Sequence, residues 1–387
     1  MMTLKKQIWI AFCSLPLFLL TGCWDSLELH ERSFVMGIAL DETEDDKLQL
    51  TAQIYKPAPG GAQSNQCGQK SYVNIPIVEN TVSEAVRKIP IHLGRKAHWG
   101  HLRTILIGEK LAREKGVGEI LEFFYRDHEP RITSSVMIAK GKAADCLDQQ
   151  PLMELTTGQQ LLQNERAANR YSQRTLEINL LKLAKQARSE LGNTMLPYAF
   201  IARKDAETSA SVAGLALLKA GKLVGSLSSE HVDRLKMIRD EFDNGMIQVP
   251  CPTQPDKMEV VEVISSTSTL TPVIKGDALK VSVLTKMDIA LQELSCSRTD
   301  DPEKEKKFAK HFEQFLEKEL QKTVAQLKKE KFDGLDLGNK LYAKDPALWK
   351  RWKNSWERRF VDSEFDFHVK IRMISSGTTR GKPMLSK

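Results

Sequence analysis

The first 23 residues constrain this chain most, because they decide in which compartment the rest of it folds. Lys5 and Lys6 precede an apolar run from Ile8 to Leu20. That run is shorter than the roughly 20 apolar residues of a permanent transmembrane helix. Its length and its flanking charge are typical of a secretory signal peptide. We therefore predict that residues 1–22 are a signal peptide and that the remaining chain folds outside the cytoplasm.

The end of the apolar run predicts lipid attachment. Leu20, Thr21 and Gly22 are the expected recognition residues of a signal peptidase, since small side chains let an extended chain enter its groove. Cys23 follows, and its thiol can accept a diacylglyceryl group. Together with an N-acyl chain such as palmitate, this lipid would hold the protein stably, because each buried methylene contributes roughly 0.8 kcal/mol. The alternative is an uncleaved core helix that happens to contain a cysteine.

The residues directly after Cys23 are predicted to lie close to the membrane. Trp24 and Asp25 are within about 7 Å of the lipid along an extended chain. The indole of Trp24 is expected at the headgroup level, where such rings partition well. Asp25 and Glu28 are expected to stabilise the first turn of the fold or to contact a partner in the membrane.

The charge and the hydrophobicity of the chain indicate what kind of partner it binds. Removing Lys5 and Lys6 with the signal peptide lowers the formal net charge from +7 to +5. This small excess suits a surface that faces anionic lipid and gives no indication of nucleic acid binding. No second apolar run approaches the ~18 residues of a spanning helix. The mature chain is therefore predicted to be anchored on a membrane rather than threaded through it.

Four cysteines remain beyond Cys23, and none is part of a CxxC motif, so zinc or thioredoxin-like sites have no support. They are Cys67, Cys146, Cys251 and Cys296. An exported protein is compatible with a Cys67–Cys146 or a Cys251–Cys296 disulfide. Free buried thiols are the preferred prediction, because unpaired cysteine behaves as a small apolar side chain.

Hydrophobic periodicity predicts an α+β fold. Strands are expected next to strands, as in Ser33–Leu40 followed by Leu48–Tyr55, and helices come in groups. The clearest helix is Pro302–Lys329, and Phe365–Met373 alternates as a final strand. Regular βαβ repetition is absent, which argues against a doubly wound fold. We predict two or three domains with mixed or antiparallel sheets packed by helices.

Polar segments suggest where these domains meet. Residues 150–175 are rich in Gln and Asn, and Lys204–Ser209 is the best candidate for a linker. A helix is expected over Thr175–Leu191, and another should begin at the Thr81 capping box and end at Pro90. The predicted division is an N-terminal α+β domain (23–150), a middle segment (151–206), a C-terminal α+β domain (207–375) and a disordered basic tail (376–387).

Catalytic motifs are not found, so the sequence predicts a protein without enzymatic activity. It contains no phosphate loop, no GxGxxG, no HExxH and no GxSxG. His98 and His101 could ligate a metal if they were helical, but Gly100 between them favours a turn with packed histidines. A dense charged group is expected to form a local salt-bridged turn, or else a partner-contact surface. It comprises Arg126, Asp127, Glu129 and Arg131.

Several short segments resemble one known family. Gly22-Cys23-Trp24-Asp25 followed by Glu28-Leu29 is the most specific of them. The others are Met36–Asp41, Gly100-His101, Gly214-Leu215-Ala216 and Gly221–Gly225. Together they resemble the Ger(x)C family, the C-subunit lipoproteins of bacterial spore nutrient-germinant receptors. The resemblance covers nearly the whole mature chain.

The resemblance implies a receptor subunit without chemistry of its own. Such proteins are lipid-anchored on the outer face of the spore inner membrane and work with integral-membrane A and B subunits. The receptor senses amino acids or sugars and starts germination, and whether the small-molecule nutrient touches this subunit stays open. The family fold is expected to have three α+β domains, and it supplies no catalytic residue, metal or other cofactor. The alternatives are a solute-binding lipoprotein with a cleft between two α/β lobes and a secreted hydrolase.

Overall fold

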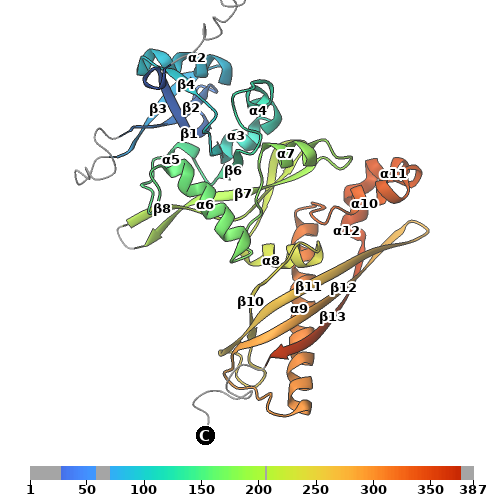
Figure 1. The fold of residues 1–387 in the computed structure, drawn as a ribbon. Coiled ribbons are helices and arrows are strands. Elements are labelled where there is room, and N and C mark those ends of the chain that lie inside the picture. The colour runs from blue at the N-terminus through green and yellow to red at the C-terminus, as the bar shows by residue number, and fades with distance from the viewer. Residues whose placement is uncertain (1–27, 58–69, 205–206, 376–387) are drawn as a thin grey trace, which may run out of the picture.

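The computed structural model describes residues 28–57, 70–204 and 207–375. Residues 28–227 build the upper part of the molecule in Figure 1. Its elements, in chain order, are η2 (Leu29–Glu31), β1 (Arg32–Glu42), β2 (Leu48–Tyr55), β3 (Tyr72–Glu79), α2 (Val82–Leu93), β4 (Lys96–His98), β5 (Thr104–Gly108), α3 (Glu109–Glu114), α4 (Val117–Arg126), β6 (Ser135–Ala139), α5 (Ala143–Leu147), α6 (Thr157–Arg170), α7 (Leu180–Ala187), β7 (Asn193–Lys204), β8 (Glu207–Lys219) and β9 (Lys222–Leu227).

These strands form one nine-stranded sheet in the order β3-β2-β1-β5-β6-β7-β8-β9, with β4 paired to β1. The pairs from β1 through β5 and β6 to β7 are parallel, whereas the outer pairs are antiparallel. Every residue of β5 and β6 is buried, since helices cover both faces at the centre of the sheet. The beginnings of β1, β5 and β6 therefore lie side by side at one end of the strands. This row of strand ends, where the chain enters the fold, is here called the edge of the first sheet where β1 begins.

Residues 229–375 build the second part around a four-stranded sheet in the order β10-β11-β12-β13. Its elements are α8 (Ser229–Ile238), β10 (Gly245–Pro250), β11 (Met258–Lys275), β12 (Ala278–Glu293), α9 (Pro302–Lys329), α10 (Leu337–Lys344), α11 (Pro346–Trp352), η3 (Lys353–Ser355), α12 (Trp356–Asp362) and β13 (Glu364–Ser375). Two sheets packed by helices confirm the predicted α+β class. The three domains implied by the resemblance are not seen as three sheets.

The long helix α9 has the predicted bounds, and it packs along the second sheet (Figure 1). Phe312, Leu316 and Leu320 are fully buried on its inner face. Its Glu313 and Glu317 carboxylates accept hydrogen bonds of 3.0 Å from backbone N–H groups of β13. Because β13 is an edge strand, these contacts cover backbone groups that would otherwise be open for pairing.

The two parts share one continuous core through α8. Val232, Leu235 and Met237 of this helix are buried. Between the two parts, the Lys236 ammonium of this helix donates to the backbone oxygen of Asn169 over 3.1 Å, and the Leu191 N–H donates to the Asn339 amide oxygen over 3.0 Å. The second sheet is therefore packed against the first part rather than suspended from it.

Three local predictions were wrong. Pro90 does not end α2, which continues to Leu93 and closes at Gly94 in the left-handed conformation. The helix expected over Thr175–Leu191 is reduced to α7, because residues 175–179 pack as extended chain beside β6. The polar stretch 150–175 contains the well-formed helix α6, whose Thr156 N-cap accepts a hydrogen bond from the Gln159 N–H.

The predicted linker at Lys204–Ser209 is part of a hairpin instead. The strands β7 and β8 pair antiparallel along their whole length, up to Lys204 opposite Glu207. The segment 151–206 thus supplies α6, α7 and β7 to the first sheet, and residues 207–227 add two more strands to it. Polar composition suggested a boundary here, but pairing between strands is a tertiary interaction that local composition does not reveal.

Candidate functional site

The predicted site residues cluster at the amino terminus, and most lie outside the described residues. This applies to Leu20, Thr21, Gly22, Cys23, Trp24 and Asp25, for which the predictions stay predictions. Glu28 is the first described residue. Its backbone N–H donates to the Glu31 carboxylate over 2.8 Å, and the Glu31 N–H donates to the Glu28 carbonyl over 3.1 Å. Glu28 thereby forms part of the turn η2 that leads into β1.

The tether between Cys23 and the folded part is short. Nine residues separate Cys23 from Arg32, the first residue of β1. Fully extended, they span roughly 30 Å. The edge of the first sheet where β1 begins is therefore the part of the fold that lies nearest to any lipid on Cys23.

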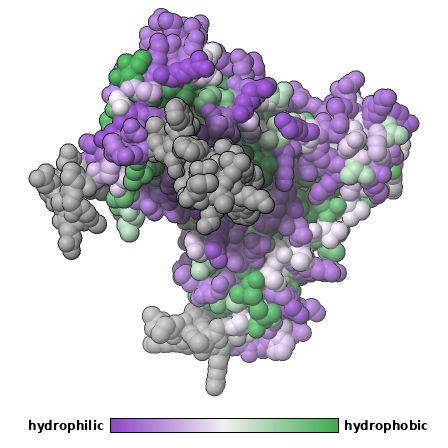
Figure 2. All heavy atoms as spheres, turned by 45° about the horizontal axis from the view of Figure 1, so that its top comes forward, coloured by the Kyte–Doolittle hydropathy of each residue, from purple (hydrophilic) through white to green (hydrophobic). Residues whose placement is uncertain are grey.

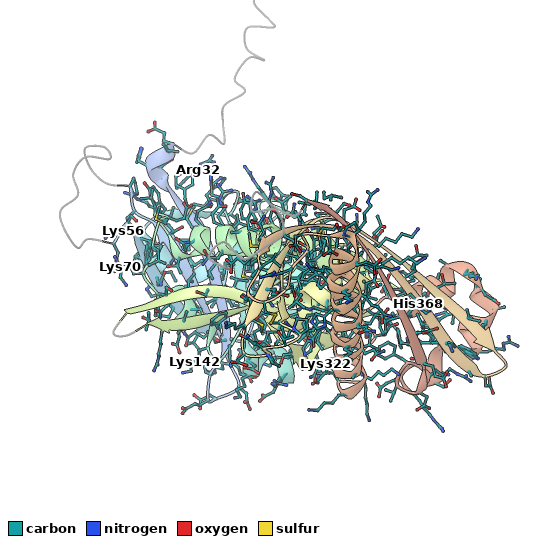
Figure 3. The ribbon with its side chains drawn as sticks, turned by 90° about the horizontal axis from the view of Figure 1, so that it is seen from below. Arg32, Lys56, Lys70, Lys142, Lys322 and His368 are labelled. Carbon is teal, nitrogen blue, oxygen red and sulfur yellow. A yellow bond between two sulfur atoms is a disulfide. The ribbon has the colours of Figure 1, made fainter. Side chains whose placement is uncertain are left out.

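Several elements far apart in the sequence meet at this edge. In Figure 3, Arg32, Lys56 and Lys70 lie on the same side of the molecule, at the start of β1, the end of β2 and the start of β3. The chain between α5 and α6 is fixed beside them. The Ser71 hydroxyl donates to the Leu155 carbonyl over 2.5 Å, and the Tyr72 hydroxyl donates to the Gln149 carbonyl over 3.2 Å.

The connection 149–156 between α5 and α6, here called the apolar loop, exposes large hydrophobic side chains. Leu152, Met153 and Leu155 are 69%, 89% and 61% exposed. The loop is nevertheless ordered, because the Gln160 amide oxygen accepts hydrogen bonds from the Met153 and Glu154 N–H groups at 2.9 and 3.3 Å. Figure 2 shows a largely hydrophilic surface with separate hydrophobic patches, so such exposure is not the rule on that face.

A groove of about 410 Å³, here called the Arg103 groove, lies between the apolar loop and the start of β1. Phe34, Met36, Tyr55 and Leu155 form its apolar walls. Its polar lining comprises His101, Arg103, Glu154, Thr156 and Gln159. Burial, together with the charge of Arg103, lowers the pKa of the neighbouring His101, so this histidine is neutral at pH 7.

Sequence reasoning missed both features. The stretch around residues 150–175 was interpreted as a polar boundary, although Leu152-Met153-Glu154-Leu155 is an apolar island within it. Pro151 just before that island and the Thr156 cap just after it indicate a short loop with no room to turn its side chains inward. The apolar walls of the groove come from β1, β2 and the apolar loop, which no local pattern relates.

The histidines of the predicted alternative metal site pack against an aromatic ring. The rings of His98 and His101 contact Phe34 edge-on, with centroid distances of 5.6 and 5.1 Å. Among the described residues, neither histidine belongs to a group of three potential metal ligands. Their position matches the packed-histidine interpretation.

The charged group after α4 forms local contacts. Arg126 pairs with Glu122 one turn earlier on the same helix, over 2.5 Å. The Asp127 carboxylate accepts from the Glu129 N–H over 2.8 Å, and the Glu129 carboxylate pairs with Lys96 over 3.4 Å. The contacts of Arg126 and Asp127 are local, as the first interpretation expects, whereas the Glu129–Lys96 pair links this turn to β4.

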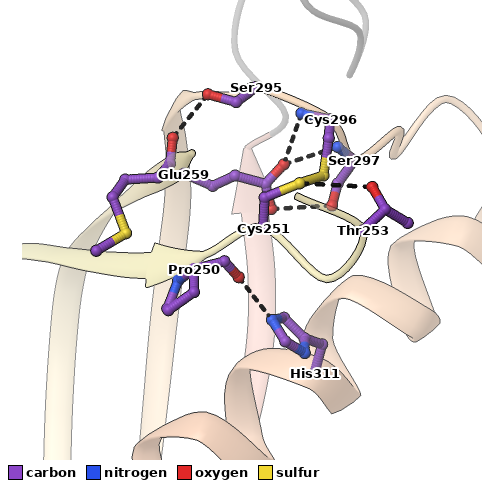
Figure 4. The surroundings of a disulfide bond; sticks show 9 residues. Pro250, Cys251, Thr253, Glu259, Ser295, Cys296, Ser297 and His311 are labelled. Atoms are coloured by element: carbon purple, nitrogen blue, oxygen red, sulfur yellow. Dashed lines mark hydrogen bonds between the residues drawn. A yellow bond between two sulfur atoms is a disulfide. The ribbon is translucent and has the colours of Figure 1, made fainter. Parts of the chain in front are cut away.

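A disulfide joins Cys251 and Cys296 in the second part (Figure 4). The preferred prediction of free thiols was therefore wrong for this pair. The buried Glu259 carboxylate supports the bridge from one side, accepting from the N–H groups of Cys296 and Ser297 at 3.2 and 2.7 Å. Two cysteines and a carboxylate this close resemble a metal site, but the sulfurs are bonded to each other and the carboxylate is occupied.

Cys146 and Cys67 are the other two cysteines that follow Cys23. Cys146 is a buried free thiol on α5, and burial raises its pKa to about 12, so it is not a reactive thiolate at neutral pH. Cys67 lies outside the described residues. Of the helices in the described ranges, none combines the length and the apolar character needed to cross a bilayer.

Two family matches cover most of the chain and adjoin within the β7–β8 hairpin of the first sheet. Residues 25–201 match the family described as "Spore germination protein N-terminal domain". Residues 213–377 match the one described as "Spore germination B3/ GerAC like, C-terminal". The chain belongs to the Ger(x)C family. This is the family of spore germination receptor C subunits, and membership confirms the resemblance.

Individual relatives agree with this family along nearly their whole length. "Spore germination protein B3" of Bacillus subtilis (strain 168) is 28% identical over 94% of this chain and 96% of its own. "Spore germination protein KC" of the same organism is 25% identical over 92% of each. The crystal structure of the GerBC protein matches with a TM-score of 0.56 at 22% identity, covering 90% of this chain and all of that one. This last likeness shows a shared fold.

Proposed function

We propose that this Ger(x)C member is a lipid-anchored, non-enzymatic subunit of a spore nutrient-germinant receptor. In this proposal, diacylglyceryl and N-acyl groups on Cys23 hold it on the extracytoplasmic face of the spore inner membrane. There it assembles with integral-membrane A and B subunits and takes part in the signal that starts germination. The main observation in support of this proposal is that the match to the family's N-terminal domain begins at residue 25, two residues after the cysteine of the predicted lipid-attachment motif.

The short tether supports this proposal on physical grounds. An anchor within roughly 30 Å of β1 confines the folded part to the membrane surface. Confinement raises the effective concentration of the chain for partners in the same membrane, so that modest contacts suffice for assembly. A basic edge with Arg32, Lys56 and Lys70 suits an anionic bilayer.

Buried acidic groups in this fold have structural roles, which fits a subunit without chemistry. The Asp333 carboxylate, fully buried, accepts from the N–H groups of Leu335, Leu337 and Gly338 and from the indole of Trp356. It thereby holds the start of α10 against α12. Glu165 similarly bridges α6 and the strand β6.

The solute-binding alternative predicts a cleft between two similar lobes. The two parts of this fold differ instead, with nine strands in one sheet and four in the other. This difference favours the receptor-subunit proposal, and calorimetry with amino acids and sugars separates the two functions.

Replacing the anchor tests the proposal. Cys23→Ala should abolish acylation, release or mislocalise the protein and weaken germination in response to nutrients. Cys67→Ala is the matched control, since it removes a cysteine outside the lipid-attachment motif and should leave localisation unchanged. A Cys23→Ala protein that stays on the spore inner membrane and supports normal germination would refute the proposal.

A further inference from the structure

We propose that the apolar loop and the Arg103 groove together form a second membrane contact, in addition to the lipid anchor on which this inference rests. Leu152, Met153 and Leu155 enter the bilayer, and the Arg103 guanidinium binds the phosphate of an anionic phospholipid. The contact would hold the first sheet in one orientation on the membrane, which attachment at a single point does not do.

The exposed side chains are the first observation. Three large apolar residues within four positions are held outward, because the Met153 N–H donates to the Gln160 amide oxygen and the Leu155 carbonyl accepts from the Ser71 hydroxyl. A soluble surface loop gains nothing from this arrangement, because apolar area in water is unfavourable. Contiguous exposed apolar residues mark contacts with proteins or membranes. Leu29, 74% exposed in the turn η2, adds to the same side of the fold.

The second observation is an unpaired cation beside the loop. Within the described part of the chain, the buried Nε atom of Arg103 has no hydrogen-bond partner. Among the residues that the structure describes, no carboxylate forms an ion pair with this guanidinium, not even Glu154 in the same groove. The Gln159 amide oxygen is likewise buried without a partner. Buried donors and acceptors are normally paired, so both atoms point to a ligand with polar and apolar parts.

The position of the anchor indicates that the ligand of the Arg103 groove is a membrane lipid. The chain between Cys23 and Glu28 leads to this edge of the sheet, so the nearest apolar phase is the bilayer that holds the lipid. Lys56 and Lys70 flank the edge and match an anionic surface. A phospholipid supplies in one molecule a phosphate for Arg103 and acyl chains for Phe34 and Tyr55. The groove volume of about 410 Å³ suits part of such a molecule.

The test places a fluorescent label at position 153 of the full acylated chain in vesicles. Met153→Cys on a Cys67→Ser background carries an environment-sensitive dye, and Cys146 stays unlabelled because it is buried. Met246→Cys, 64% exposed on the second sheet, is the matched control. In phosphatidylglycerol vesicles, emission at 153 should shift to the blue and be quenched by nitroxide lipids, whereas emission at 246 should change in neither respect.

The role of Arg103 is tested in vesicles with graded phosphatidylglycerol content. Arg103→Gln should shift the equilibrium between docked and undocked label about fivefold toward undocked, the effect of one cation near an anionic surface. Arg351→Gln, an exposed arginine on α11, should leave it unchanged. A fivefold shift in both variants, or in neither, would overturn the assignment to Arg103.

Flotation and the mass of the same samples separate the two proposals. A chain that lacks the lipid and does not float contradicts the lipid anchor itself. A chain that is acylated and floats, but whose label at 153 stays in water, overturns only the second contact. The same holds if position 153 becomes shielded solely when the A and B subunits are present, because the loop would then bind protein.

Discussion

The buried Glu165 on α6 makes the stability of the first part depend on pH. Its side chain is fully buried, with one oxygen 2.5 Å from the Ser135 hydroxyl and the other accepting from the Ile178 N–H over 2.9 Å. Burial raises its pKa from 4.5 to about 8, although both hydrogen bonds favour the charged form. At pH 7 the folded protein therefore holds a proton that the unfolded chain has released.

The size of the effect on stability follows from the difference between the pKa of Glu165 in the folded and in the unfolded chain. Between 4.5 and about 8, at about 1.4 kcal/mol per tenfold change in proton affinity, the protonated form gains roughly 5 kcal/mol in the folded state. A raised folded-state pKa gives stability that is complete below pH 4.5 and is lost as the pH rises through 8. Glu165→Gln keeps the shape and the hydrogen-bonding capacity without the titration. It should be more stable than the parent at pH 8 and above, by up to that amount.

The assay is urea unfolding of the full chain at a series of pH values from 5 to 9. The free energy of unfolding of the parent should fall toward alkaline pH relative to Glu165→Gln. Glu177→Gln is the control, since this partly exposed residue pairs with Arg166 at 3.5 Å and should not reproduce the slope. A constant difference between the parent and Glu165→Gln across this range would refute the reasoning.

Two further predictions concern covalent and steric contacts. Cys251→Ser should lower the free energy of unfolding by about 4 kcal/mol, the chain-entropy value for a bridge across 45 residues; an equal urea midpoint for oxidised parent and variant would contradict it. Gly158→Ala should destabilise by about 1–3 kcal/mol, because its added Cβ would lie 2.6 Å from the Met36 carbonyl oxygen. Gly118→Ala on α4, in open space, should instead stabilise by up to about 1 kcal/mol, and equal thermal midpoints for both alanine variants would rule out this account.

Sequence patterns predicted those elements whose signal is local. The helix α9 was predicted with its observed bounds from its long apolar stripe, and the structure adds that Asp301 is its N-cap. The strand β2 was predicted with equal accuracy from its alternation. Errors came where distant segments decide the outcome. Residues 175–179 have helical periodicity but lie extended beside Ser135, since pairing there satisfies backbone groups of both segments.

The candidate functional surface also has one part that local sequence predicts and another part that only the fold brings together. The predicted lipid-attachment motif at Cys23 is a linear signal, because such motifs are recognised as consecutive residues. The Arg103 groove cannot be predicted so, because Phe34, Tyr55 and Gln159 come from β1, β2 and α6. The same limit applies to the Cys251–Cys296 bridge, because the sequence left both a disulfide and free thiols open for this pair.

The amino-acid sequence by itself determined the α+β class, the family and the long helix of the second part, because each depends on neighbours in the chain. Only the tertiary structure decided that residues 151–227 complete the first sheet, which cysteines pair, and that Arg103 lies unpaired beside an exposed apolar loop. The physical reason is that strand pairing, burial and the loss of a charge partner depend on contacts between segments that are far apart in the chain.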